Sequence, residues 1–482
     1  MALETVIGLE VHAQLKTNTK IFCSCPTAFA AEENTQVCPV CLGMPGVLPV
    51  LNKKVVEFGI RTGLALNCEI ASNCRFDRKN YFYADLPKGY QISQLDKPIC
   101  LGGHIEVNGR QIKLNRAHLE EDAGKLVHAG AAGLHGSDYS KVDFNRSSMP
   151  LLEIVSEPDL HSPEEARLYL TELRSILRYI EVCDGNLEEG SFRCDANVSM
   201  RPVGSTELGT KTEIKNMNSF KAVQRAIQSE IERQTKMIEA GERIVQETRL
   251  WNEAEGKTFP MRSKEEAHDY RYFPEPDLMP VTISREWVQQ IREQLPELPA
   301  ERRHRYLNEH GLSSEDSIVL AETRELSDFF DTAVSLGAPA KAACNWLMGP
   351  TMAYLKDSKK EFTEVKLTPQ NLADICAAVS SGKIGSTAAK QLLVELLESG
   401  GDVSKLIESK GLAQVSDEGP IKAMVQAVLD KSPSQIAEYA SGKTKVRQYF
   451  FGEVMKAAKG KANPQVINKL LDEMLPTPAE QA

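Results

Sequence analysis

The clearest pattern in the chain is an alternation of apolar and polar positions that begins near residue 190. Phe192 through Met200 are apolar at every second position, and the positions between them carry Arg193, Asp195 and Asn197. A period of two predicts a β-strand with one buried face and one polar face. The polar face would then place these three charged or amide side chains in a row.

A second polar strand is expected after a short turn-rich gap, because Lys211, Glu213 and Lys215 share one parity. If the two strands pair antiparallel, their common surface presents two carboxylates, three cations and an amide. That surface suits a metal ion and a phosphate group. A solvated sheet face with cross-strand ion pairs has the same pattern, so periodicity leaves both interpretations open.

The same alternation runs from residue 5 to residue 15 and predicts another strand. Glu10 and His12 leave this strand on the same side, at a spacing that lets two side chains reach one ion. A hydrogen-bonded surface pair is the alternative interpretation.

Two further groups of acids stand out. His118-Leu-Glu-Glu-Asp packs three acids together, which is unfavourable unless cations or water offset their charge. Glu153 is a single acid within the apolar run 151–155, and a buried carboxylate needs a partner. We expect that partner to be an arginine such as Arg146, with a metal as the alternative, and we interpret Glu153 as structural.

Four cysteines form two close pairs, Cys23 with Cys25 and Cys38 with Cys41, and Gly43 follows the second pair. Two such pairs joined by a short loop match a four-thiolate zinc site, whereas four free buried thiols would be the alternative. Because sulfur would fill all four positions, the Zn²⁺ would be structural.

Helical patterns replace strands in the second half of the chain. In the first half, Ser162, Pro163 and Glu165 predict a capped helix start, and a second helix is expected over 222–238. Beyond residue 281 the periodicity predicts helices near 287–295, 318–334, 340–355, 368–380 and 386–398. The fold class is therefore α+β: a largely antiparallel first domain followed by all-α domains.

Composition adds limits to this picture. With 482 residues, 41% hydrophobic and 26% charged, the chain is expected to form about three globular domains. It lacks an apolar run long enough to span a membrane and a basic signal-peptide start, so we expect no membrane association and a cytoplasmic location.

The net charge of −10 contrasts with the segment 441–469, where seven basic residues face the single acid Glu453. This local excess is a candidate nucleic-acid surface, and a solvated basic face is the alternative. Neither glycine-rich nucleotide fingerprint occurs in the sequence, so a nucleotide would be held through metal-bridged phosphates. An amidase signature is also missing, so ammonia for any amide synthesis would come from elsewhere.

Several long motifs give the chain a family resemblance. They are Arg78-Lys-Asn-Tyr-Phe-Tyr, His118-Leu-Glu-Glu-Asp-Ala-Gly-Lys, Val142-Asp-Phe-Asn-Arg-Ser-Ser-Met-Pro, Ser191-Phe-Arg-Cys-Asp-Ala-Asn-Val-Ser, Lys215-Asn-Met-Asn-Ser-Phe, Asp269-Tyr-Arg-Tyr-Phe-Pro and, in the tail, Gly452-Glu-Val-Met-Lys and Lys459-Gly-Lys-Ala-Asn-Pro. The chain resembles the B subunit of glutamine-dependent aspartyl/glutamyl-tRNA amidotransferases over essentially its whole length. It departs from that pattern at Ala84, where the family has Pro, and at Ser148-Met149, where the family has Gly-Val.

The resemblance implies an ATP-dependent, glutamine-hydrolysing ligase that works as a heterotrimer with an amidase A subunit and a small C subunit. ATP would phosphorylate the side-chain carboxylate of Glu or Asp misacylated onto tRNA, and ammonia from the A subunit would then give Gln-tRNA or Asn-tRNA. The implied domains are a cradle-shaped catalytic domain (1–293), a helical linker (294–405) and a helical tRNA-binding tail (406–482).

The candidate site residues follow from this chemistry. Because Mg²⁺ prefers oxygen ligands, the expected magnesium site comprises Glu10, His12, Asp195, Glu213 and one of Glu120 and Glu121, with Glu121 favoured. Arg193 and Lys215 would offset charge on the transferred phosphoryl group, beside Asp195 and Glu213 as catalytic acids. The expected tRNA-binding residues are Lys443, Lys445, Arg447, Lys456, Lys459 and Lys461.

Two other classes of protein keep part of the pattern. A stand-alone carboxylate–amine ligase would need the acids and not the basic tail. A non-catalytic tRNA-binding scaffold would need the tail and tolerate loss of the acids.

Overall fold

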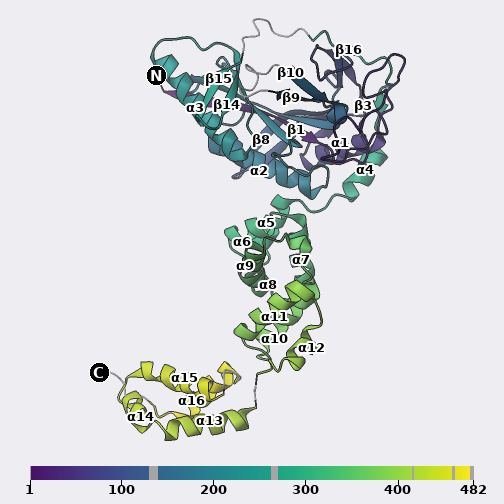
Figure 1. The fold of residues 1–482 in the computed structure, drawn as a ribbon. Helices are drawn as coiled ribbons and strands as arrows, with labels where there is room; N and C mark the ends of the chain where they lie inside the picture. Colours follow the sequence, from purple (N-terminus) through teal and green to yellow (C-terminus); the bar gives the residue numbers. More distant parts are fainter. Residues whose placement is uncertain (1, 130–138, 262–269, 415–416, 459–461, 478–482) are drawn as a thin grey trace. The chain divides into compact units, whose positions relative to one another are not determined.

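The computed structural model describes residues 2–129, 139–261, 270–414, 417–458 and 462–477 (Figure 1). The chain divides into two compact units, Met1–Pro299 and Ala300–Ala482. All described strands belong to the first unit, and the second unit is helical. The predicted α+β class is therefore confirmed.

A ten-stranded sheet forms the centre of the first unit, in the order β15-β14-β13-β12-β1-β11-β8-β6-β2, with β7 paired to β8. Its strands are β1 (Leu3–Gln14), β2 (Glu69–Ile70), β6 (Cys100–Leu101), β7 (His104–Val107), β8 (Arg110–Glu121), β11 (Pro150–Ser156), β12 (Phe192–Pro202), β13 (Thr212–Lys215), β14 (Glu247–Asn252) and β15 (Lys257–Pro260). Only the β13–β14 pair is parallel among these strands, so the prediction of a largely antiparallel sheet is confirmed.

Smaller sheets flank the large one. β4 (Asp77–Asn80) pairs with β5 (Tyr90–Ser93) and β16 (Phe273–Pro274). β9 (Lys125–Ala129) pairs with β10 (Tyr139–Asp143), and β3 (Asn73–Cys74) pairs with β17 (Val281–Thr282). In Figure 1 the β9–β10 pair and β16 lie above the large sheet.

Helices α2 (Pro163–Tyr179) and α3 (Phe220–Glu239) lie side by side below the sheet (Figure 1). Their apolar stripes cover the buried face of β1 and β12. On β1 this face consists of side chains such as Ile7, Leu9 and Val11, which are fully buried. Ser162 caps α2 as predicted, accepting a hydrogen bond from the Glu165 backbone N–H. The Glu165 carboxylate accepts from the backbone N–H of His161 at 2.7 Å, one residue before the position that a capping box requires.

Two further helices complete the first unit and contact each other, α1 (Lys53–Ala65) and α4 (Arg285–Glu293). The helix expected over 287–295 is α4, and it ends before Pro296. None of the described helices is both long enough and apolar enough to cross a membrane.

The second unit consists of helices. They are α5 (Pro299–Asn308), α6 (Ser314–Leu320), α7 (Arg324–Ser335), α8 (Ala340–Trp346), α9 (Met352–Ser358), α10 (Pro369–Ser380), α11 (Ser386–Ser399), α12 (Val403–Ser409), α13 (Glu418–Asp430), α14 (Pro433–Ala440), α15 (Arg447–Ala457) and α16 (Pro464–Met474). The single helix expected over 318–334 is wrong, because Thr323 begins a new helix by accepting a hydrogen bond from the Leu326 N–H. The helix expected over 340–355 is interrupted by the π-turn Leu347–Thr351, which contains Pro350.

This unit contains two separate hydrophobic cores. One extends from Tyr306 to Ile407 and the other from Ile421 to Leu471. A linker domain and a tail domain would each need such a core. The division at residues 293 and 405 stays a prediction.

Candidate functional site

The charged face of the sheet is assembled from five neighbouring strands, β8, β11, β1, β12 and β13. The antiparallel register places Glu10 opposite Asp195 and Asn197 opposite Glu213. The Asn197 amide donates to Glu10 Oε1 at 2.9 Å. The expected pairing of the two polar strands is therefore confirmed, and it brings the candidate acids onto one surface.

Lys215 closes one end of this surface. Its Nζ lies 2.6 Å from Asp195 Oδ2 and 3.0 Å from Glu213 Oε1. Burial would raise the pKa of Glu213, but the charge of Lys215 and a hydrogen bond from Thr248 lower it. Burial, with the charges of nearby acids, raises the pKa of Glu10. Two of the predicted magnesium ligands, Asp195 and Glu213, therefore pair with a lysine, and Glu10 lies near both acids.

Histidines occupy the other end. His12 Nε2 lies 3.5 Å from Glu153 Oε2 and 3.8 Å from Glu120 Oε1, and His118 Nε2 lies 3.3 Å from Glu153 Oε2. Ligand atoms of His12, Glu120 and Glu153 all lie within 4.8 Å of one another, so these residues could hold one metal ion.

The protonation of this end follows from its contacts. Burial would lower the pKa of His12, but hydrogen bonding to Glu153 and the charges of Glu153 and Glu120 raise it to about 9. Burial would raise the pKa of Glu153, but His118 and His12 hold it well below its usual range. At neutral pH Glu153 thus retains its charge and His12 carries a proton, which a bound dication would displace.

Two predictions about these acids need correction. Glu153 is partnered by histidines and not by Arg146, whose guanidinium donates to the carbonyls of Ala123 and Gly124 and lies 3.5 Å from Asp122. The structure also favours Glu120 over Glu121. Strand parity explains the choice, because residues two apart share a face and Glu120 is two residues from His118.

Glu121 faces a different environment. It forms an ion pair with Lys88 and accepts hydrogen bonds from the Ile92 N–H at 2.8 Å and from Ser148 Oγ at 2.5 Å. Ser148 has a φ of 60°, in the left-handed region where glycine is favoured. The serine that replaces the family glycine therefore gains a hydrogen bond to a buried acid in exchange for backbone strain.

A cavity of about 290 Å³ connects the two ends. Its lining includes His12, Glu120, Asp195, Arg193 and Lys215, together with Asp122, Lys79 and Tyr81. Asp122 accepts from Arg193 Nη2 at 2.9 Å, and the charge of Asp122 raises the pKa of Arg193.

Sequence reasoning assigned no role to Asp122, Lys79 or Tyr81. Lys79 and Tyr81 come from β4 and the loop after it, and Lys79 Nζ lies 4.9 Å from the centre of the Tyr270 ring. Burial would lower the pKa of Lys79, but Glu120 and other neighbours raise it. Lys79 and Tyr81 reach the cavity because β4 pairs with β5 and β16 in a small separate sheet. The sequence contains no signal for that pairing.

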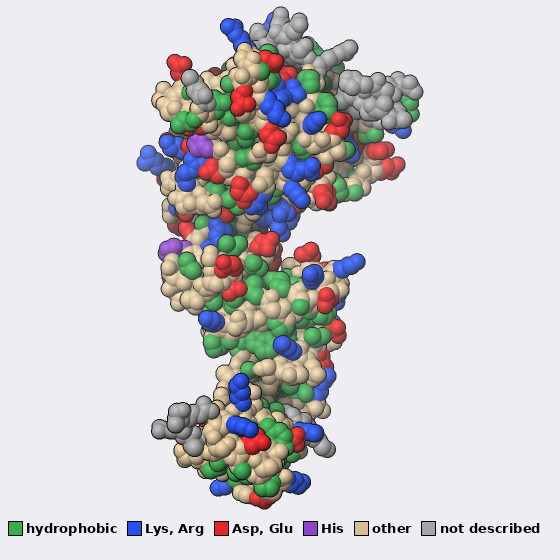
Figure 2. All heavy atoms as spheres, turned by 90° about the vertical axis from the view of Figure 1, so that its left-hand side faces the viewer, with side chains coloured by type: hydrophobic (Ala, Val, Ile, Leu, Met, Phe, Trp, Pro, Cys, Tyr) green, Lys and Arg blue, Asp and Glu red, His purple; other side chains and the backbone are tan. Residues whose placement is uncertain are grey.

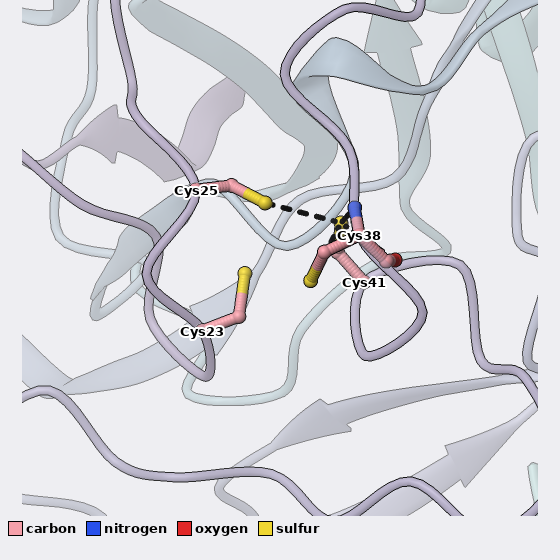
Figure 3. A group of neighbouring side chains, drawn as sticks. All are labelled: Cys23, Cys25, Cys38 and Cys41. Carbon is pink, nitrogen blue, oxygen red and sulfur yellow. Dashed lines mark hydrogen bonds between the residues drawn. The ribbon is translucent and has the colours of Figure 1, made fainter.

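The four predicted zinc ligands also converge (Figure 3). Their sulfur atoms lie within 4.8 Å of one another, and those of Cys25 and Cys38 lie 4.0 and 3.9 Å from Cys41. Tetrahedral zinc with 2.3 Å bonds needs sulfurs about 3.8 Å apart, so the cluster fits this ion. Hydrogen bonding from Cys23 and the charge of Lys20 lower the pKa of Cys41, which favours the thiolate that binds metal.

Some basic residues of the tail form ion pairs, although the lysines among them remain exposed. Arg447 donates to Asp472 and Asn468, Lys443 lies 3.6 Å from Glu438, and Lys456 lies 3.7 Å from Glu453. Lys459 and Lys461 lie outside the described residues. The role of all six tail residues in tRNA binding stays a prediction.

Comparison with known proteins places this site in a family. Residues 5–289 match the GatB/GatE catalytic domain, and residues 328–475 match the GatB domain. The sheet with its acidic face is thus a catalytic domain of the GatB/GatE class.

Full-length relatives define the family more closely. The chain is 55% identical to a protein of Geobacter sulfurreducens and 53% identical to one of Thermodesulfovibrio yellowstonii, each over 98% of this chain and 100% of the relative. A protein of Brevibacillus brevis is 52% identical over 98% of both chains. All three are named as the B subunit of an aspartyl/glutamyl-tRNA(Asn/Gln) amidotransferase. The chain belongs to this family of amidotransferase B subunits.

Proposed function

We propose that the chain activates the side-chain carboxylate of Glu or Asp carried by a misacylated tRNA. In the first step the carboxylate oxygen attacks the γ-phosphorus of ATP, giving an acyl phosphate and ADP. In the second step ammonia attacks the acyl carbon and inorganic phosphate leaves, giving Gln-tRNA or Asn-tRNA. The observation that carries this proposal is one cavity with carboxylates and an imidazole at one end and a lysine at the other.

The residues present fit a magnesium ion. Glu120 and Glu153 supply carboxylate oxygens, and His12 supplies a nitrogen within the same 4.8 Å limit. Hard divalent cations prefer such oxygen-rich sites and retain some water. A bound Mg²⁺ would neutralise phosphate charge there. Asp195 and Glu213 pair instead with Lys215, and Glu10 accepts a hydrogen bond from Asn197.

The cations of the cavity have complementary roles. Lys215 is held by Asp195 and Glu213, and Arg193 is held by Asp122. Fixed cations stabilise charge that develops on a transferred phosphoryl group without reorganising during the reaction. We assign this role to Lys215 and Arg193, while Asp195 and Asp122 position them.

The remaining assignments follow from the family. The relatives are named as subunits, and we propose a cytoplasmic heterotrimer in which an amidase A subunit supplies ammonia and a small C subunit completes the assembly. The four cysteines would hold a structural Zn²⁺. The helical segment 406–482 would contribute to tRNA binding.

Charged-tRNA-stimulated ATP hydrolysis by the reconstituted complex tests the proposal. We expect Glu-tRNA(Gln) to stimulate hydrolysis beyond uncharged tRNA, and Asp195→Asn to lower the stimulated rate on the order of 10²–10³-fold. Asp96→Asn is the matched control, because Asp96 also pairs with a basic side chain, Arg75 at 3.2 Å, but is exposed and outside the cavity. Full stimulation in Asp195→Asn would indicate a scaffold, and amidation of free glutamate without tRNA would indicate a stand-alone ligase.

A further inference from the structure

A second cavity, about 780 Å³ in volume, lies between α3 and the β14–β15 hairpin. It shares no lining residue with the cavity of the charged face. The side of α3 that lines it repeats every three or four residues from Lys221 to Lys236, opposite the stripe that packs on the sheet. We call this cavity the α3 groove.

Positive charge dominates the lining of the α3 groove. Six cations line it, Lys221, Arg225, Arg233, Lys236, Arg249 and Lys257, together with one acid, Glu232. The chain as a whole has a net charge of −10, so this concentration of cations is local. Figure 2 shows this side of the first unit, where Lys and Arg side chains lie among acidic ones.

The three arginines are fixed by acids outside the lining. Arg233 Nη2 lies 2.6 Å from Glu230 Oε1, Arg249 Nη1 lies 2.7 Å from Glu247 Oε1, and Arg225 pairs with Glu253. Glu230 itself is fully buried. The floor of the groove is therefore ordered by its own contacts and does not need a ligand to form.

The three lysines differ from the arginines. Lys221, Lys236 and Lys257 are exposed, and within the described part of the chain none of them has an ion-pair partner. These unpaired cations leave the lining of the groove with a net positive charge, which a bound anion would offset.

The shape of the groove selects the kind of anion. Lys221 and Lys236 lie about 22 Å apart along the helix axis at the usual rise per residue, so a single small anion cannot contact both. Trp251, the aromatic residue of the lining, is only 3% exposed and lies beneath Arg225, so it offers no ring for base stacking. A line of phosphates meets these constraints, since phosphate contacts position a nucleic acid without reading its bases.

We propose that the α3 groove binds the phosphodiester backbone of the tRNA substrate through Lys221, Lys236 and Lys257. This inference rests on the proposed function, because it takes its RNA from that reaction. It adds a tRNA contact within the first unit, separate from the basic segment of the tail.

The test compares two triple variants of the reconstituted complex. One carries Lys221→Gln, Lys236→Gln and Lys257→Gln. The control carries Lys97→Gln, Lys113→Gln and Lys141→Gln, which removes the same charge from exposed lysines of the first unit outside the groove. The dissociation constant for tRNA is measured across a range of salt concentrations, with kcat and KM for amidation.

We expect the groove variant to bind tRNA roughly 10–100-fold more weakly at low salt. The slope of log K for tRNA binding against log salt concentration should become shallower by about 2–3, because three phosphate contacts are lost. Its KM for tRNA should rise at unchanged kcat, while the control matches the wild type. Unchanged affinity and slope in the groove variant would overturn the inference. So would a variant that fails to assemble with the other subunits yet binds tRNA normally, since the groove would then be a protein interface.

Failure of the proposed function gives a different result. In that case the wild-type complex would bind tRNA without charged-tRNA-stimulated ATP hydrolysis. The loss of affinity in the groove variant would still be measurable, so the two failures are distinguishable.

Discussion

Ser148 shows how one residue combines backbone strain with a favourable contact. Its left-handed φ of 60° is costly for a residue with a Cβ, and its hydroxyl donates to the buried Glu121 carboxylate at 2.5 Å. The family pattern has glycine here, which relieves the strain but has no hydroxyl. The backbone strain and the hydrogen bond have opposite effects on stability, and substitutions of Ser148 can separate them.

We expect Ser148→Ala to lower the free energy of unfolding by about 1–3 kcal/mol, because it loses a hydrogen bond to a charged group and retains the strain. Ser148→Gly should be less destabilising than Ser148→Ala by about 1 kcal/mol, because glycine adopts positive φ freely. Urea unfolding followed by tryptophan fluorescence measures both values. Equal losses in the two variants would show that strain at Ser148 is negligible.

Lys20 links the cysteine cluster to the turn that carries Ser148. It is fully buried, and its Nζ lies 3.7 Å from Cys41 Sγ and 3.4 Å from the Phe144 carbonyl. A buried ammonium needs a compensating anion, and a cluster of thiolates with zinc supplies one.

Lys20→Met should therefore weaken zinc binding by roughly 10–100-fold, the usual effect of losing a residue that supports metal ligands. Lys20→Arg should retain most of the affinity because it keeps the positive charge. Competition with a chromophoric chelator gives the affinities, and Lys16→Met, an exposed lysine four residues earlier, is the control. Wild-type zinc affinity in Lys20→Met would show that its charge does not support the cluster.

Among the elements, α3 contacts the sheet through a buried acid as well as through its apolar stripe. Glu230 is fully buried and contacts Arg233, Arg249, Gln234 and Thr258. Removing one partner from a buried ionic network leaves uncompensated charge.

Glu230→Ala should destabilise the first unit by about 3–5 kcal/mol for this reason. Glu232→Ala should change stability by less than about 0.5 kcal/mol, since Glu232 is exposed two residues later on the same helix. Thermal unfolding by calorimetry compares the two variants. A small loss in Glu230→Ala would mean that the arginines find other partners.

The periodicity of the sequence predicted the strands of the site better than it predicted which strands lie next to each other. The alternation around Asp195 and Glu213 predicted both strands and their shared face, because each strand has one buried side. It did not place Glu153 beside His12 and His118, since that contact depends on the order β8-β11-β1, which local pattern does not encode. The helix prediction over 318–334 overlooked the polar run Glu322-Thr-Arg-Glu325, in which Thr323 caps α7.

At the scale of the whole molecule, the two compact units have separate cores. The described core of the first unit ends at Leu298, and that of the second begins at Tyr306. A unit with its own core can fold alone.

Fragments 1–299 and 300–482 should therefore each fold alone, the first with one unfolding transition and the second with one for each of its two cores. The first should retain the cysteine cluster and bind zinc, because all four ligands lie within it. Circular dichroism melts and a zinc titration of the separate fragments check this. A fragment 1–299 that is unfolded with zinc present would contradict the assignment of two independent units.

We propose that His12, Glu120 and Glu153 form the metal-binding end of a carboxylate-activating site. The most direct test is the Mg²⁺ dependence of charged-tRNA-stimulated ATP hydrolysis in Glu120→Gln, with Glu106→Gln on β7 as the exposed control. We expect Glu120→Gln to need at least roughly tenfold more Mg²⁺ for half-maximal activity, while the control is unchanged. A wild-type Mg²⁺ dependence in Glu120→Gln would contradict it and place the metal elsewhere.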